Sequence, residues 1–267
     1  MSDLLVTNGL TKRYGGLTAN DAVAMTLAAG EVRGLIGPNG AGKTTFVNVI
    51  TGIERPDSGS VALDGTAVTG LAPNLIAARG LVRSFQVARV FGNLTVRENL
   101  MVPYFASERT SGTAAGVARI AELLRLSTLE PLAGDLAKSL SGGQRMLLQA
   151  CAGFMIPDVQ VHVLDEPFAG INPVVKDTLI ELILHENRTR GAAFLIVSHE
   201  MEIIRRICPR VTVMIAGRVA AEGPLDEIAR REEVIPPISG ARSNEHAAQR
   251  HRRACRLPAR RRHLARP

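Results

Sequence analysis

A lysine and a threonine close the glycine-rich run Gly37-Pro38-Asn39-Gly40-Ala41-Gly42-Lys43-Thr44, which has the spacing G-x-x-x-x-G-K-S/T. Its three glycines let backbone N–H groups turn inward and approach phosphate oxygens, where a Cβ atom would block the approach. Lys43 supplies a positive charge for the β- and γ-phosphates, and the hydroxyl of Thr44 is placed to bind Mg²⁺. The run therefore predicts a site for a nucleoside triphosphate.

Two carboxylates, Asp165 and Glu166, follow the apolar stretch Val159–Leu164. The carboxyl end of a strand is where a parallel α/β sheet presents side chains to a ligand. In that position Asp165 can hold Mg²⁺, directly or through water, and Glu166 can orient the attacking water or accept its proton. Taken alone, the pair suits a solvated loop equally well, and a lone histidine such as His199 is more often a satisfied polar residue than a catalytic one.

A second glycine motif, Leu140-Ser141-Gly142-Gly143-Gln144, precedes the apolar, helix-like run Met146–Phe154. The hydroxyl of Ser141 and the glycine amides could form another anion site at the start of a helix. An ordinary serine N-cap with flexible glycines explains the isolated motif better. Because the two acids and a further strand follow downstream, the capping explanation is no longer the favoured one.

In this order and spacing, the motifs resemble the ATP-binding cassette family, the nucleotide-binding subunits of ABC transporters, over roughly residues 4–230. The resemblance implies that Asp165 is the metal ligand of the Walker B motif and that Glu166 is the catalytic base. It also implies that His199, after the strand Ala193–Val197, is the switch histidine that contacts the γ-phosphate.

Further site residues are implied by the same resemblance. Tyr14 matches the aromatic residue that stacks on adenine, although ordinary surface packing would also explain it. Gln86 matches the glutamine that reaches Mg²⁺ or the lytic water and moves with the transport partner, although a plain polar loop residue would fit. The implied Mg²⁺ ligands are Thr44, Gln86 and Asp165. The implied ATP contacts are Tyr14, Gly37, Pro38, Asn39, Gly40, Ala41, Gly42, Lys43, Thr44, Thr45, Ser141, Gly143 and Gln144.

Asn172 occupies the place of the family's D-loop, where many members carry aspartate. It can also cap the helix that begins at Pro173, since asparagine favours the N-cap and proline the first helical position. The two roles are compatible. His162 departs from the family pattern because it interrupts an aliphatic strand, and we interpret it as a core histidine with a hydrogen-bond partner.

Strand and helix patterns alternate after Asp165, which indicates a parallel sheet with crossover helices. Asp64-Gly65 is a hairpin signal, and Thr95 and Glu98 form a capping box. The expected strands are Leu4–Leu10, Ala22–Leu27, Val32–Ile36, Ser60–Leu63, Leu81–Phe85, Val159–Leu164, Ala193–Val197, Arg210–Ile215 and Arg218–Glu222. The expected helices are Thr44–Thr51, a stretch from Thr95, Ala114–Leu124, Met146–Phe154, Pro173–Arg190 and Met201–Ile207.

The resemblance and these patterns together predict an α/β fold, a P-loop NTPase cassette with a mostly parallel core sheet. An antiparallel β subdomain precedes the sheet, and an α-helical subdomain is inserted at about residues 87–155. The ATP-binding domain is expected to span residues 4–235. No internal repeat of cassette size is present, so the chain holds one cassette.

Because the chain holds a single cassette, the resemblance implies that a second cassette is its partner. By resemblance, Ser141, Gly143 and Gln144 of one subunit cover the ATP held by Lys43 of another, in a homodimer or a paralogous heterodimer. The resemblance also implies transmembrane permease subunits and, indirectly, a periplasmic or extracellular solute-binding protein. A closed two-fold arrangement suits such a self-complementary interface.

Segments around the motifs look like the cassettes of branched-chain amino acid importers. They are Gly15–Leu17, Arg55–Gly59, Val82–Gln86, Phe91–Asn99 and Asp165–Pro173. Relatives that serve urea, short amides or lipopolysaccharide export remain alternatives, because the cassette does not contact the solute. A soluble ABC ATPase acting on DNA or ribosomes and a degenerate nucleotide sensor are further alternatives.

Composition favours a cytoplasmic location, and the resemblance implies a peripheral position on the cytoplasmic face of the inner membrane. The sequence lacks an 18-residue apolar run and a signal-peptide pattern. Three separated cysteines indicate a reducing compartment.

The positive charge of the chain is concentrated in its last residues. Residues 241–267 hold nine arginines and one glutamate, a net charge of +8, whereas the whole chain carries +7. Residues 1–240 therefore have a net charge of −1 and offer little electrostatic attraction for nucleic acid. Residues 236–267 are interpreted as a disordered basic tail, a frameshift product or, less favoured, an anchor for anionic lipid.

Overall fold

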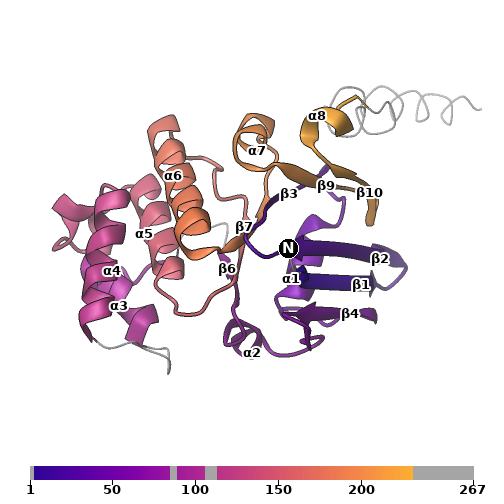
Figure 1. The fold of residues 1–267 in the computed structure, drawn as a ribbon, viewed down its shortest axis with the longest axis horizontal. Coiled ribbons are helices and arrows are strands. Elements are labelled where there is room, and N and C mark those ends of the chain that lie inside the picture. The colour runs from indigo at the N-terminus through magenta and orange to yellow at the C-terminus, as the bar shows by residue number, and fades with distance from the viewer. Residues whose placement is uncertain (1–2, 85–88, 106–112, 231–267) are drawn as a thin grey trace, which may run out of the picture.

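Two β-sheets and a group of helices make up the computed structural model, which describes residues 3–84, 89–105 and 113–230 (Figure 1). Helices α3–α5 lie at one side of the molecule, the strands β1, β2 and β4 lie at the other, and the second sheet lies between them. Two expectations, Gln86 and the tail from residue 236 onward, fall outside the described residues.

The first sheet is antiparallel, with strand order β2-β1-β4-β5. Its strands are β1 (Asp3–Tyr14), β2 (Leu17–Ala28), β4 (Ser58–Leu63) and β5 (Thr66–Ala67). The hairpin between β4 and β5 turns at Asp64 and Gly65, whose φ angles of 47° and 70° are those of a type I′ turn. The hairpin prediction is therefore confirmed.

The second sheet is mostly parallel, with strand order β10-β9-β3-β8-β7-β6. Its strands are β3 (Val32–Ile36), β6 (Leu81–Ser84), β7 (Val161–Asp165), β8 (Ala193–Val197), β9 (Arg210–Ile215) and β10 (Arg218–Gly223). Only β10 pairs antiparallel, with β9. Every residue of β3, β7 and β8 is buried, as in parallel sheets that are covered on both faces.

The helices fill the connections. They are α1 (Lys43–Ile50), α2 (Pro73–Ala77), α3 (Val96–Phe105), α4 (Thr113–Leu126), α5 (Gly142–Phe154), α6 (Pro173–Arg190), α7 (Met201–Ile207) and α8 (Leu225–Ile228), with 3₁₀ turns at Glu130–Leu132 and Ala137–Ser139. The capping box at α3 is confirmed: the amide of Glu98 donates to Thr95 Oγ1 at 3.1 Å, and the amide of Thr95 donates to Glu98 Oε2 at 2.7 Å. Among the described residues, the structure contains no helix whose length and hydropathy would let it span a bilayer.

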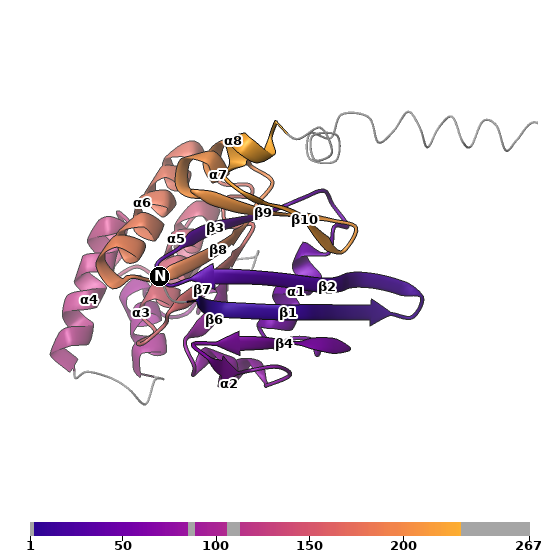
Figure 2. The same cartoon turned by 45° about the vertical axis from the view of Figure 1, so that its right-hand side comes forward.

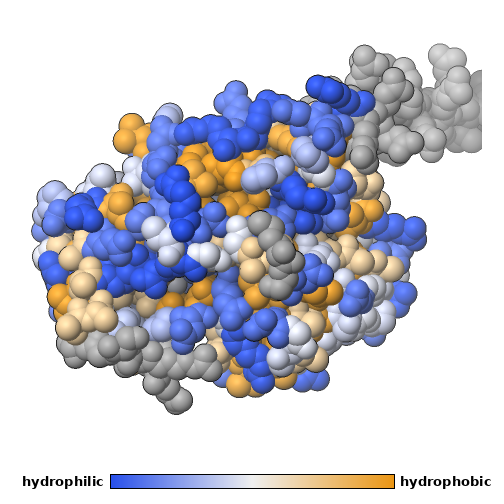
Figure 3. Space-filling view, in the orientation of Figure 1, coloured by the Kyte–Doolittle hydropathy of each residue, from blue (hydrophilic) through white to orange (hydrophobic). Residues whose placement is uncertain are grey.

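Helix α1 is enclosed by the two sheets, as Figure 2 shows. Its buried side chains Phe46, Val47, Val49 and Ile50 belong to one apolar cluster with residues of both sheets. This packing fixes the start of α1, and with it the glycine-rich run, relative to the ends of the parallel strands. Most of the surface seen in Figure 3 is polar, with smaller apolar areas between.

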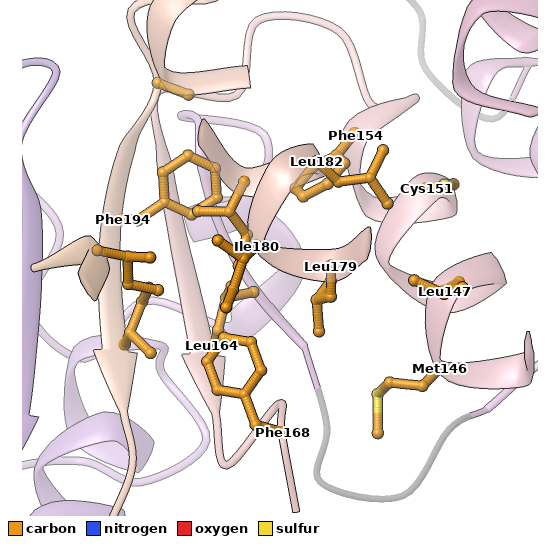
Figure 4. Packing of buried hydrophobic residues seen from close by; sticks show 14 of the residues in the cluster. Met146, Leu147, Cys151, Phe154, Leu164, Phe168, Leu179, Ile180, Leu182 and Phe194 are labelled. Atoms are coloured by element: carbon orange, nitrogen blue, oxygen red, sulfur yellow. The ribbon is translucent and has the colours of Figure 1, made fainter. Parts of the chain in front are cut away.

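A second apolar cluster joins the helices to the other face of the parallel sheet (Figure 4). Leu147 and Phe154 of α5 and Leu179 of α6 are among its buried side chains. His162 of β7 is 4% exposed, and its ring stacks on Phe194 at a centroid distance of 5.1 Å. The interpretation of a core histidine is confirmed, while its hydrogen-bond partner stays a prediction.

The observed boundaries differ from the expected ones mainly in the first sheet. Strands β1 and β2 extend well beyond Leu4–Leu10 and Ala22–Leu27, because they continue as a two-stranded ribbon in which Tyr14 pairs with Leu17. Polar residues in that ribbon interrupt the alternation of apolar and polar side chains from which the strand boundaries were predicted. Helix α2 was not expected at all, since its five residues are too few to show a helical period.

Candidate nucleotide site

The glycine-rich run connects β3 to α1, and two of its glycines are required by close backbone contacts. Gly37 has a φ of +148°, and a Cβ there would lie 2.1 Å from the carbonyl oxygen of Met214. Gly42 has a φ of +93°, and a Cβ there would lie 2.2 Å from the carbonyl oxygen of Ala19. Other residues would force these neighbours apart, so the loop conformation depends on glycine at both positions.

A cleft of about 680 Å³ opens beside this loop. It brings together Tyr14, residues 39–45 and both acids that the sequence singled out, whereas Gly37, Pro38 and His199 are not among its lining residues. Its lining residues are Tyr14, Leu17, Thr18, Ala19, Asn39, Gly40, Ala41, Gly42, Lys43, Thr44, Thr45, Asp165, Glu166, Val197, Ala216 and Gly217. The strands β3, β7, β8 and β9 run parallel, so their carboxyl ends meet at this one edge of the sheet.

Lys43 is held within its own loop. Its ammonium group donates to the carbonyl oxygens of Gly37 at 2.7 Å and Pro38 at 3.0 Å. Desolvation lowers the pKa of Lys43, and the charges of Glu166 and Asp165 oppose that shift. The cation therefore lines the cleft together with the acids, and phosphate oxygens could replace its carbonyl contacts.

Asp165 ends β7 and is paired with Arg83 of the neighbouring strand β6, with Nη2 2.6 Å from Oδ2. Nη1 of the same guanidinium donates to Oδ1 of Asn48 on α1 at 2.5 Å. Neither Arg83 nor Asn48 was expected at the site. A signal was present, because an arginine interrupts the otherwise apolar start of the strand Leu81–Phe85.

Glu166 stands in the left-handed region with a φ of +50°, which is uncommon for a residue with a side chain. Its amide donates to the carbonyl oxygen of Val197 at the end of β8 at 2.9 Å, which stabilises this conformation. Oε2 of Glu166 lies 2.9 Å from Nδ1 of His199. The side chain of Glu166 is 18% exposed and that of His199 is 68% exposed, so His199 is the more accessible member of the pair.

Tyr14 lines the cleft and is 45% exposed. Its hydroxyl donates to Oε2 of Glu54, and Oε1 of Glu54 accepts from Nδ2 of Asn48 at 2.7 Å. The ammonium of Lys12 lies 5.4 Å from the centre of the ring. One edge of the ring is thus tied down while the residue stays accessible to a ligand.

The second glycine motif lies elsewhere, at the start of α5. Ser141 caps this helix through a complete capping box: its Oγ accepts from the amide of Gln144 at 3.3 Å, and Gln144 Oε1 accepts from the amide of Ser141 at 2.8 Å. A Cβ at Gly143 would lie 3.0 Å from Val175 of α6. The structure does not place Ser141, Gly143 or Gln144 among the lining of the cleft that holds Lys43.

Asn172 caps α6 as expected. Its Oδ1 accepts from the amide of Val175 at 3.0 Å, and Pro173 is the first helical residue. The local capping role is therefore confirmed. Val174, which follows, is 75% exposed and presents an apolar side chain beside this loop.

The donors in the cleft fit Mg²⁺ bound together with phosphate. The hydroxyl of Thr44 and the carboxylate of Asp165 are oxygen ligands, which this ion prefers. Within the described ranges, no cluster of three or more His, Cys, Asp or Glu residues could hold a metal by itself. Phosphate oxygens of a nucleotide would have to complete the coordination.

Comparisons with known proteins agree with this geometry. The profile of the ABC transporter family matches residues 20–169. The chain is 34% identical to the probable branched-chain amino acid transport ATP-binding protein LivG of Archaeoglobus fulgidus, over 91% of this chain and 97% of that protein. It is 34% identical to the high-affinity branched-chain amino acid transport ATP-binding protein LivG of Salmonella typhimurium, over 89% and 98%. A solved nucleotide-free ATP-binding cassette from an ABC transporter superposes with a TM-score of 0.76 at 28% identity, over 88% of this chain and 98% of that chain.

Proposed function

Since the chain belongs to the ABC transporter family and is an ATP-hydrolysing subunit of it, we propose that it energises the import of branched-chain amino acids. The observation that best supports ATP hydrolysis is a cleft lined by the phosphate-binding loop together with Asp165 and Glu166. The choice of solute is supported by relatives named for branched-chain amino acid transport, which match nearly their whole length. Urea, short amides and exported lipopolysaccharide are the other solutes to test.

In the proposed reaction, the amides of the loop and Lys43 bind the β- and γ-phosphates of ATP. Thr44 and Asp165 would hold Mg²⁺, which neutralises charge that develops on the phosphates. Glu166 orients the attacking water and accepts its proton, and His199 contacts the γ-phosphate from its position beside Glu166. The 2.9 Å separation of Glu166 and His199 supports these two roles, because the two groups could then act on the same γ-phosphate.

A second cassette completes the proposed site. Ser141, Gly143 and Gln144 do not line the cleft of their own subunit, which supports a role in covering the ATP of a partner. The proposal is a head-to-tail dimer with two ATP molecules between the subunits, either a homodimer or a paralogous heterodimer. ATP binding would close the pair and hydrolysis would reopen it. The ATP-binding domain is assigned to residues 4–235, with a helical part at about 87–155.

The permease contact is assigned to a hollow of about 280 Å³ between β6, α3 and α5. Ser84 and Arg89, which flank residues 85–88, line it together with Phe91, a 58% exposed aromatic residue. A permease segment seated there would touch the chain on both sides of Gln86. The subunit would then sit peripherally on the inner face of the membrane, and the solute-binding protein would act through the permease.

Purification of a tagged chain from native membranes tests this function. We expect permease subunits to co-purify, and vesicles containing the complex to take up leucine when ATP is supplied inside. Lys43→Ala should assemble normally and abolish uptake. Absence of any permease would refute the transport role, whereas uptake of urea or an amide in place of leucine would refute only the proposed solute.

A further inference from the structure

A single guanidinium joins three elements behind the nucleotide cleft. Arg83 is on β6, and its side chain is 10% exposed. It donates in two directions, to Asp165 at the end of β7 and to Asn48 on α1. Asp165 is 9% exposed, so solvent and salt screen this ion pair only weakly.

The position of Asn48 shows which parts of the nucleotide site are connected by the bridge Asn48–Arg83–Asp165. Asn48 follows Thr44 by one helical turn on α1, so the two residues share one face of the helix. The helix that carries the Thr44 hydroxyl is thereby tied to the strand that carries the Asp165 carboxylate. The bridge continues outward, because Nδ2 of Asn48 donates to Glu54, which also accepts from Tyr14.

We propose that Arg83 is a positioning residue for the metal site: its guanidinium fixes the Asp165 carboxylate relative to Thr44. This inference rests on the proposed roles of Asp165 and Thr44 as Mg²⁺ ligands. Arg83 also lines the hollow assigned to the permease. One side chain therefore reaches both the metal ligand and the surface where a partner would bind.

Arginine is suited to this task for a geometric reason. Its planar fork presents donors in fixed directions, so one group can bond to Asn48 and Asp165 simultaneously. Lysine would keep the charge beside Asp165, but its ammonium sits on a flexible stem and cannot reproduce the fork. Arg83→Lys therefore separates the loss of geometry from the loss of charge.

The test measures metal binding directly, with Mn²⁺ as the probe. Binding of Mn²⁺ to the folded chain in the presence of ADP is followed by electron paramagnetic resonance, and ADP binding in EDTA is followed by calorimetry. Loss of a group that orients a metal ligand typically weakens metal binding by about tenfold or more. We expect that loss in Arg83→Gln, a smaller one in Arg83→Lys and Asn48→Ala, and metal-free ADP binding within about twofold of the parent.

The double variant Arg83→Gln/Asn48→Ala should lose little more than Arg83→Gln alone, because both substitutions break the same link. Arg79→Gln is the matched control, since Arg79 is an exposed arginine near the start of β6 that bonds to the carbonyl of Leu75 on α2. Thermal unfolding followed by circular dichroism shows which variants are folded. If Arg83→Gln does not fold, the inference is tested with Arg83→Lys and Asn48→Ala alone.

Unchanged or tighter Mn²⁺ binding in a folded Arg83→Lys and Asn48→Ala would overturn the inference. An equal loss of metal-free ADP binding would also overturn it, because it would reflect general damage to the loop. If ADP does not raise Mn²⁺ binding by the parent chain, or if Asp165→Ala and Thr44→Ala leave it unchanged, the proposed metal ligands themselves are wrong. This result is distinguishable from the others, because it appears in the parent chain or in variants that leave both Arg83 and Asn48 unaltered.

Discussion

Glu166 and His199 meet, with Oε2 and Nδ1 2.9 Å apart, although each follows a different strand. The strands β7 and β8 are parallel neighbours in which Asp165 is in register with Val197. Glu166 is the first residue after β7 and His199 the second after β8, so both emerge at the same edge of the sheet. The hydrogen bond from the amide of Glu166 to Val197 fixes the left-handed turn that directs the glutamate toward the histidine.

Glu166→Gln should slow ATP hydrolysis by about 10²- to 10⁴-fold, the range expected for loss of a positioned base. Its amide keeps the shape of the carboxylate, so ATP binding should persist and ATP-bound dimers should accumulate. Hydrolysis is measured by phosphate release, and dimers by size-exclusion chromatography with ATP. Lys43→Ala is the contrasting variant, because it should weaken ATP binding itself. Hydrolysis at the parental rate in Glu166→Gln would show that another group is the base.

Mixed dimers test the composite site. Lys43→Ala and Ser141→Arg should each be inactive alone, yet a mixed dimer retains one intact site made from the unaltered parts of both subunits. The mixture should therefore recover part of the ATPase activity. The two chains carry different tags, so mixed dimers can be isolated before the assay. Isolated mixed dimers without any activity would contradict head-to-tail pairing.

Asn172→Ala removes the N-cap of α6 and should cost about 1 kcal/mol of the free energy of unfolding. Asn172→Ser should restore most of that stability, because serine also caps helices. Urea unfolding measures both variants, and the ATPase rate is measured in parallel. Equal stability but unequal ATPase rates in Asn172→Ser and the parent would show a role beyond capping.

His162 should make stability depend on pH. Burial lowers its pKa from 6.5 to about 3, and the charge of Arg119 acts in the same direction. The folded state thus favours the neutral ring, so stability is full above pH 6.5 and falls as the pH drops toward 3. Between pH 7 and pH 5 this residue should cost about 2 kcal/mol.

His162→Phe should remove that part of the pH dependence, since phenylalanine keeps an aromatic ring against Phe154 and Phe194. Urea unfolding at pH 5, 6 and 7 compares the two proteins. Identical pH slopes would show that protonation of His162 is not coupled to unfolding.

Truncation after Ile235 should leave ATPase activity and thermal stability unchanged, because the basic segment 236–267 lacks an apolar pattern that could join a core. Activity and melting temperature are compared with the full chain. Loss of either would refute a dispensable segment. If only membrane association falls, and does so in a salt-sensitive manner, the segment acts as an electrostatic anchor.

Local sequence patterns were sufficient to predict most elements of the fold. β3, α6, β8, α7 and β9 have the expected boundaries, because apolar runs of strand length, proline at a helix start and glycine at a helix end are short-range signals. The caps at Thr95 and Asn172 were likewise readable from residues three positions apart or fewer.

The sequence by itself determined the phosphate-binding loop, the two acids and the order of the elements, because each depends on neighbours along the chain. Only the tertiary structure decided which groups meet: Arg83 with Asn48 and Asp165, and Glu166 with His199. Those contacts depend on strand order and register, which place distant residues at one sheet edge. The spacing of residues along the chain does not reveal strand order or register. The contacts of Arg83 with Asn48 and Asp165 could therefore be identified only from the tertiary structure.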